Sequence, residues 1–260
     1  MTGYYYHYTT GQAFTDIAKS KSFWLTNGRY LNDPMDCDDR GDDLKALADA
    51  LLTGELKTAF MKVRNKVVEA YVTSFAKSSD SLLHWRAYGD DGAGIALGFD
   101  PALLVSSERA PGGYRLDPKL MISAQPVIYK QSKLDEYLRL IFESSVKRVE
   151  DGEDVKSVAI NMLLTSKTIL CGYKHESWAG EDETRLIHLA TDSAPEVLQR
   201  GFRVNRGNLY DYAVSPFQAK ALKTVIIGPK CSFDEAMIER FLFKLGYSNF
   251  TIERSKLLYR

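Results

Sequence analysis

The order of helical and β-prone segments is the feature that most constrains the fold of this chain, because the two kinds do not alternate strictly. The β-prone stretch from Tyr4 to Thr9 opens the sequence, and two amphipathic helical segments precede the strand patterns YVTSFA and GIALGFD. Two more helical segments follow, before a remainder that is mainly strand-forming. A doubly wound fold requires strict alternation, and no GxGxxG motif connects a strand to a helix. The pattern therefore indicates an α+β fold.

Length and charge narrow the choice of partners. The chain has 260 residues, 45% of them hydrophobic, which is enough for a substantial core, and we expect a single domain over residues 1–260. Lys and Arg together number 34, as do Asp and Glu, so no net charge would attract nucleic acid or an anionic membrane surface. Small-molecule or protein partners are favoured instead.

Three cysteines, Cys37, Cys171 and Cys231, lie far apart in the sequence and form no CxxC pair. Their odd number predicts reduced thiols and a cytoplasmic protein. The opening residues MTGYYYHYTT lack the basic and apolar regions of a secretory signal, and no run of eighteen or more apolar residues is present. We expect neither secretion nor a membrane-spanning segment.

Several local signals mark the ends of helices. Thr9 with Gln12 has the spacing of a capping box, and so has Ser232 with Glu235. Glycines at positions 172 and 246 are expected to end two helices. The segment GDDGAG is rich in glycine but precedes a strand rather than a helix, so we interpret it as a turn and not as a phosphate-binding loop.

The sharpest constellation of polar residues is Glu181, Glu183 and Arg185. Alternate side chains of a strand share one face, so the three would project together if a strand begins slightly before Glu183. Two adjacent carboxylates with a nearby cation are a common device of active sites. A solvated strand edge with a surface ion pair is an equally good interpretation of the spacing alone.

Histidines offer one further candidate. His7 lies near the end of the opening strand, where binding residues are common, although a histidine hydrogen-bonded within the core is the simpler interpretation. The other three, His84, His175 and His188, have no metal-ligand spacing, and HExxH is absent. We expect no metal site.

Aromatic and loop residues supply weaker candidates. Trp85 and Tyr88 would stack on a flat ligand with Arg86 meeting an anionic group, but core packing explains such aromatics better. Asn32, in the sequence LNDP, fits ligand binding and an Asx turn equally well. No GxSxG motif occurs, and no cysteine has an identifiable histidine partner, so nucleophilic hydrolase chemistry has no support.

Five segments together resemble a bacterial family known as domain of unknown function 2971. They are YHYT, FWLTNGRYLNDPMD, SFAKSSDSLLHWRAYGDDGAGIALGFD, WAGEDETRLI and VIIGP. Their order and spread cover the chain from about Tyr5 to Pro229, which makes the resemblance fairly specific.

A weaker resemblance links this pattern to ADP-ribosyltransferases. It implies an α+β fold with a central mixed or split β-sheet and flanking helices, and NAD as the substrate. In that scheme His7, next to Tyr8 and Thr9, would hold a ribose, Ser74 would support the site, and Glu183 would be the catalytic acid with Glu181 upstream. Arg185 or Arg86 would meet the diphosphate. The sequence departs from the family in lacking a distinct second-motif tyrosine and a nicotinamide-stacking aromatic residue.

These resemblances lead us to expect an NAD-dependent ADP-ribosyltransferase or NAD glycohydrolase, acting in bacterial conflict or phage defence on an unidentified acceptor. A fixed carboxylate stabilises the oxocarbenium-like charge that develops when the nicotinamide–ribose bond breaks. The alternative is a non-catalytic nucleotide- or protein-binding module with Trp85, Arg86 and Tyr88 as anchors. A third possibility is a structural ion pair in a protein whose function lies elsewhere.

Overall fold

The computed structural model describes residues 3–31, 37, 40–66, 68–105, 115–117, 122–191, 197–205 and 207–259. Its strands are β1 (Tyr5–Thr9), β2 (Ser22–Asn27), β3 (Val68–Ala76), β4 (Ile95–Phe99), β5 (Arg115–Asp117), β6 (Ile122–Pro126), β7 (Glu183–Thr191), β8 (Arg200–Asn205), β9 (Asn208–Pro216), β10 (Leu222–Ile227) and β11 (Thr251–Arg254). Its α-helices are α1 (Gly11–Ser20), α2 (Gly41–Leu51), α3 (Gly54–Val63), α4 (Leu82–Ala87), α5 (Pro101–Leu104), α6 (Gln131–Glu150), α7 (Val155–Cys171) and α8 (Glu235–Lys244). Its 3-10 helices are η1 (Gly28–Tyr30), η2 (Asp90–Gly92), η3 (Glu176–Glu181) and η4 (Ala219–Ala221).

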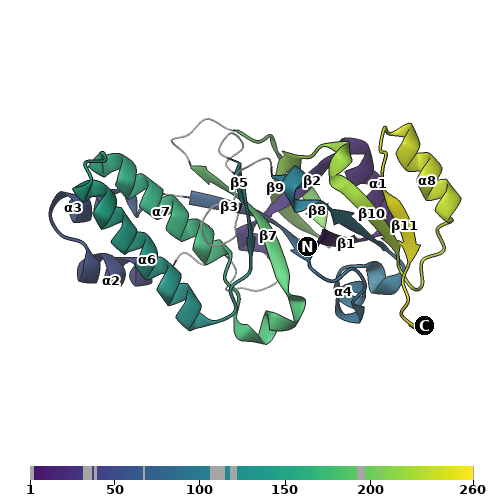
Figure 1. Cartoon of the computed structure of the whole chain (residues 1–260), viewed down its shortest axis with the longest axis horizontal. Helices are drawn as coiled ribbons and strands as arrows, with labels where there is room; N and C mark the ends of the chain where they lie inside the picture. Colours follow the sequence, from purple (N-terminus) through teal and green to yellow (C-terminus); the bar gives the residue numbers. More distant parts are fainter. Residues whose placement is uncertain are drawn as a thin grey trace.

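Within the described residues the strands form one sheet in the order β11-β10-β4-β1-β3-β2-β9-β8, and β7, β6 and β5 extend from β3. Strands β10 and β11 are parallel, whereas the other paired strands are antiparallel. Helices flank this sheet (Figure 1). The predicted α+β class with a mixed central sheet and flanking helices is confirmed.

The sheet divides along one edge of β3. On its other edge β3 pairs with β7 over its whole length, from Val68 to Ala76. Along the edge where the sheet divides, β3 pairs with two different strands. Strand β1 pairs with it at Ala76, and β2 pairs with it at Tyr71 and Val72. Among the described strands, none pairs with residues 73–75 on that edge. An opening in the sheet therefore lies beside Ser74.

Apolar side chains form separate clusters around this opening. One face of the sheet packs against α1 and α8, with Phe14, Phe23 and Phe75 among the buried residues. On the other face, α4 covers a smaller cluster that includes Tyr8 and Trp85. Helices α2, α3, α6 and α7 form a further cluster of their own and lie together at one end of the molecule (Figure 1).

Two predicted helix caps are wrong by one or two residues. The cap of α1 is Thr10 rather than Thr9, because the Thr10 hydroxyl accepts from the Ala13 amide while Thr9 still belongs to β1. The cap of α8 is Asp234 rather than Ser232, because its carboxylate accepts from the Met237 amide.

Other local predictions agree with the structure. The expected stop at Gly172 directly follows α7, and Gly246, at a φ of 82°, follows α8. The segment GDDGAG forms a turn that contains η2 and leads into β4. The segment LLHWRAY, which has no clear pattern of its own, contains α4.

Candidate functional site

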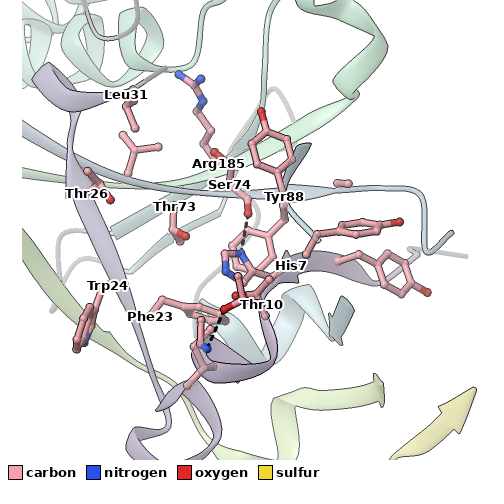
Figure 2. A pocket seen from close by; sticks show the side chains of 18 of the residues that line it. His7, Thr10, Phe23, Trp24, Thr26, Leu31, Thr73, Ser74, Tyr88 and Arg185 are labelled. Atoms are coloured by element: carbon pink, nitrogen blue, oxygen red, sulfur yellow. Dashed lines mark hydrogen bonds between the residues drawn. The ribbon is translucent and has the colours of Figure 1, made fainter. Parts of the chain in front are cut away.

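A cavity of about 1080 Å³ lies where the sheet divides. Strands β1, β2 and β3 line it together with α1, the end of α4 and the segment from Lys174 to Arg185. Figure 2 shows His7 and Ser74 near its middle, with Tyr88 to one side and Trp24 to the other. The residues predicted as site residues that line it are His7, Tyr8, Thr9, Ser74, Tyr88, Glu181, Glu183 and Arg185.

Four buried charges gather at one end of the cavity, which we call the acid end: Lys174, Glu181, Glu183 and Arg185. Each side chain belongs to a residue that is 7% exposed or less. The Lys174 ammonium lies between the two carboxylates, 2.6 Å from Glu181 Oε2 and 3.3 Å from Glu183 Oε2. Two cations and two anions cancel formally, which makes burial of the group tolerable.

Glu183 is the more completely paired of the two carboxylates. Arg185 donates from Nε to Oε1 at 2.8 Å and from Nη2 to Oε2 at 3.4 Å, and the Ser74 hydroxyl donates to Oε1. With Lys174, these donors fill the roughly four lone-pair positions of a carboxylate. Burial alone would raise the pKa of Glu183, but Arg185, Lys174 and Ser74 together hold that pKa below its usual 4.5.

Glu181 lies beside Glu183 as predicted, but its backbone conformation differs from the predicted strand. It is the last residue of η3 rather than part of a strand, and Asp182 follows it in the left-handed conformation, with a φ of 39°. This turn, not strand alternation, brings Glu181 beside Glu183. The Tyr88 hydroxyl donates to Glu181 Oε1 at 2.5 Å, and Lys174 donates to Oε2. Two contacts leave part of the acceptor capacity of Glu181 unused within the described structure.

A chain of hydrogen bonds joins His7 to Glu183 through Ser74. His7 Nδ1 donates to the Ser74 carbonyl at 3.0 Å, and the Ser74 hydroxyl donates to Glu183. Since a carbonyl only accepts, the neutral imidazole carries its lone pair on Nε2. Burial lowers the pKa of His7 below its usual 6.5, with the Ser74 carbonyl opposing this shift, so the neutral ring is the form present at pH 7.

Strand register places His7 and Glu183 on opposite faces of the sheet. Directly paired residues share a face, so Glu183 lies on the face of Ala76 and Tyr6, while His7 projects to the other side. Its ring accordingly lies near Phe23 and Phe75, at 5.4 and 5.6 Å between ring centroids. The two groups line one cavity because the sheet is open between β1 and β2.

The predicted candidates in and after α4 have different surroundings. His84 and Tyr88, four residues apart and therefore on one helical face, line the cavity. Trp85 is fully buried, packs against the Tyr8 ring at 4.8 Å and donates to Asp80, so it is a core residue. Arg86 is exposed and does not line the cavity. The remaining candidate, Asn32, lies outside the described residues.

Tyr8 and Thr9 border the cavity from β1. The Tyr8 hydroxyl donates to the Ser78 carbonyl and accepts from the Ser81 amide, so it fixes the segment that leads into α4. Thr9 is buried at the end of the strand. Tyr8 therefore has a structural part that the sequence did not indicate.

Three residues in or beside the acid end were missed from the sequence: Lys174, which belongs to it, and Tyr129 and His84, which contact its backbone. Lys174 follows α7 without any charge pattern around it. The Tyr129 hydroxyl accepts from the Glu183 amide at 2.9 Å, and His84 Nε2 donates to the Glu181 carbonyl at 3.0 Å. His84 Nδ1 is buried and has no hydrogen-bond partner within the described structure.

Neither a metal cluster nor a membrane-spanning helix is present in the parts of the chain that the structure covers. No group of three or more His, Cys, Asp or Glu side chains there is arranged to hold a metal ion. No helix there has both the length and the apolar character needed to cross a bilayer. None of the three cysteines forms a disulfide within the described structure.

Part of the chain resembles a known protein family. Residues 84–186 match the family model described as protein of unknown function (DUF2971). No curated protein and no solved structure matches the chain. The matched segment contains all four residues of the acid end together with His84 and Tyr88, whereas His7 and Ser74 precede it.

Proposed function

We propose that this chain, whose residues 84–186 match the DUF2971 family model, cleaves the nicotinamide–ribose bond of NAD and transfers the ADP-ribosyl group to an acceptor or to water. The observation that carries the proposal is the hydrogen-bond chain His7–Ser74–Glu183 beside a cavity of about 1080 Å³. That volume is slightly above the range for small-molecule sites, roughly 300–1,000 Å³, and suits a ligand of dinucleotide size.

The carboxylates of the acid end, and Glu181 in particular, would place negative charge where the reaction develops positive charge, although the four charges of the acid end cancel formally. When the bond breaks, its electron pair leaves with nicotinamide and the ribose becomes oxocarbenium-like. Glu181, which retains acceptor capacity, would accept from a ribose hydroxyl, while Glu183 adds its charge from behind. The guanidinium of Arg185 extends away from His7 and donates to the Cys171 carbonyl at 2.8 Å (Figure 2).

His7 positions the sugar from the other side of the opening. Its Nδ1 is occupied by the Ser74 carbonyl, so Nε2 is the nitrogen that accepts from a ribose hydroxyl. The lowered pKa of His7 keeps this lone pair available at neutral pH. Orientation by two fixed groups on either side of the ring favours the geometry for bond cleavage.

The test is release of nicotinamide from NAD by the purified protein, with label from the ADP-ribosyl group followed into acceptors. We expect His7→Asn, which keeps a donor near the Ser74 carbonyl but removes Nε2, to lower the rate at least about tenfold. His7→Gln, which places an amide nearer Nε2, should retain more activity. Lys133→Met, at an exposed ion pair on α6, is the matched control and should behave as wild type.

Glu183→Gln is a second test but needs a stability measurement beside it. The sequence alone suggests that this change abolishes turnover and leaves stability unchanged. The buried contacts with Arg185 and Lys174 make a loss of stability the expected result as well. Wild-type turnover in folded Glu183→Gln protein would end the proposal.

One observation favours a second candidate, a non-catalytic nucleotide-binding module. The four charges of the acid end cancel, and Glu183 is fully paired within the protein. Of the anchors first considered for such a module, only Tyr88 lines the cavity, because Trp85 is in the core and Arg86 is exposed. Binding of NAD without any release of nicotinamide would support this candidate.

The cellular setting belongs to the same proposal. Three cysteines that form no disulfide in the described structure and a nucleotide substrate fit a cytoplasmic location. A bacterial origin and a part in phage defence rest on the resemblance alone. No metal enters the proposed reaction, since the carboxylates and the imidazole carry it.

A further inference from the structure

A second group of polar and aromatic residues lines the cavity away from the acid end, and we call it the cation end: Arg203, Thr26, Trp24, Tyr30 and Tyr210. Arg203, on β8, donates from Nη2 to the Thr26 hydroxyl at 2.7 Å and lies over the Trp24 ring at 5.9 Å. Within the described structure no carboxylate lies within ion-pair distance of Arg203, and its Nε is buried without a hydrogen-bond partner. Burial lowers the pKa of this guanidinium, which expresses the cost of an unpaired charge.

Aromatic rings form the walls around this guanidinium. Trp24 stacks on Tyr212 at 4.4 Å with an angle of 17° between planes, and Tyr30 meets Tyr210 edge-on at 5.3 Å. Trp24 and Tyr30 remain 42% and 46% exposed, so part of each ring is open to a ligand. Planar rings beside an uncompensated guanidinium match the two chemical parts of a nucleotide, a base and a phosphate.

The two ends of the cavity lie on the same face of the sheet. Thr26 pairs with Val72 and Glu183 pairs with Ala76, so both side chains project to the face that Ser74 occupies between them. Four residues of β3 separate these positions, which corresponds to about 13 Å along the strand. A single extended nucleotide can therefore contact both ends.

We propose that the cation end binds the phosphate-bearing part of a nucleotide, with Arg203 on the phosphate oxygens and Trp24 and Tyr30 against the base. This inference rests on the proposed function, because it concerns the same cavity and the same ligand. It also replaces the two arginines first expected to meet the diphosphate. Arg185 is committed to Glu183 and the Cys171 carbonyl, and Arg86 does not line the cavity.

Calorimetric titration with ADP-ribose and with adenosine tests the inference without requiring turnover. We expect Arg203→Gln to weaken ADP-ribose binding about 10- to 100-fold, as for loss of a hydrogen bond between charged groups, and to leave adenosine binding within about threefold. Arg203→Lys should recover part of the loss. Arg240→Gln, on the exposed face of α8, is the matched control and should bind as wild type.

Competition by inorganic pyrophosphate against the wild-type protein keeps the test valid if Arg203→Gln fails to fold. Pyrophosphate should displace ADP-ribose but not adenosine. Unchanged ADP-ribose affinity in folded Arg203→Gln would overturn the inference. Nicotinamide release by the same variant would then show that the proposed catalytic function does not depend on the inferred role of Arg203. Absence of ADP-ribose binding to wild type would overturn the inference directly. Arginine-dependent binding without nicotinamide release would uphold it and defeat the catalytic proposal.

Discussion

Two arginines lie on one face of the sheet, Arg185 at the acid end and Arg203 at the cation end. They differ in whether the protein supplies a carboxylate partner for their charge. Arg185 is 1% exposed and donates to the Glu183 carboxylate and to the Cys171 carbonyl. Arg203 donates to the Thr26 hydroxyl and has no carboxylate partner in the described structure. A charge whose partners lie inside the protein serves to fix geometry, whereas a charge left without a counterion is available to a ligand.

The largest expected effect comes from removing the cation between the two carboxylates. Lys174→Met leaves Glu181 and Glu183 close together without their shared counterion and should lower the free energy of unfolding by about 3–5 kcal/mol in urea titrations. Lys77→Met is the matched control, because Lys77 pairs with the neighbouring Asp182 at 2.6 Å while both side chains are more than half exposed. Its cost should stay below about 1 kcal/mol. Equal losses in the two variants would refute the burial argument.

The same substitution at the two arginines separates the two ends directly. Arg185→Gln should cost about 3 kcal/mol, because it leaves buried Glu183 with Lys174 as its one remaining cation in the described structure. Arg203→Gln should cost less than about 1 kcal/mol, because one hydrogen bond is lost and an uncompensated charge disappears with it. Denaturant unfolding of both variants measures the difference. A larger loss for Arg203→Gln would mean that the cation end is structural.

Removing the Tyr88 hydroxyl measures how much one hydrogen bond to the acid end contributes to stability. Tyr88→Phe removes the donor to Glu181 Oε1 and should cost about 1.5 kcal/mol, as expected for a hydrogen bond to a charged group. Tyr259→Phe removes a comparable 2.5 Å bond to Asp91 at an exposed position and is the control. Thermal unfolding of both variants should give a clearly larger decrease in Tm for Tyr88→Phe. No difference between them would contradict the account.

The smallest effect is a dependence of stability on pH. Burial lowers the pKa of His7 and His84 below the usual 6.5, so the unfolded chain takes up these protons first. Their contribution to stability is complete above pH 6.5 and is lost as pH falls below it. Glu183, whose pKa lies below 4.5, adds a second loss as pH falls further. In His7→Asn the first loss, followed by unfolding between pH 7 and 5, should be smaller, and an identical profile would contradict the assignment.

The sequence predicted those parts of the fold that depend on local pattern. Helix α7 and its stop at Gly172 follow from apolar periodicity and glycine conformation, and the α+β class follows from the order of elements. The caps Thr10 and Asp234 were missed because neighbouring polar residues compete for the same place. Prediction was less complete wherever a contact joins distant segments.

In the candidate site, too, the features set by local sequence were predicted and the contacts between distant segments were not. Glu181 and Glu183 were expected together, but the turn at Asp182 that joins them has no signature in the spacing. Lys174 and Arg203 meet their neighbours only through tertiary structure, because Arg203 reaches Thr26 across 177 positions of sequence. Nothing in the local sequence around either residue could have indicated its position.

The most direct measurement is calorimetric titration of the wild-type protein with NAD, followed by analysis of the same sample for nicotinamide. We expect saturable binding together with nicotinamide that accumulates with time. Binding heat without any nicotinamide would contradict the catalytic claim, and the absence of both would contradict the assignment of this cavity to a nucleotide.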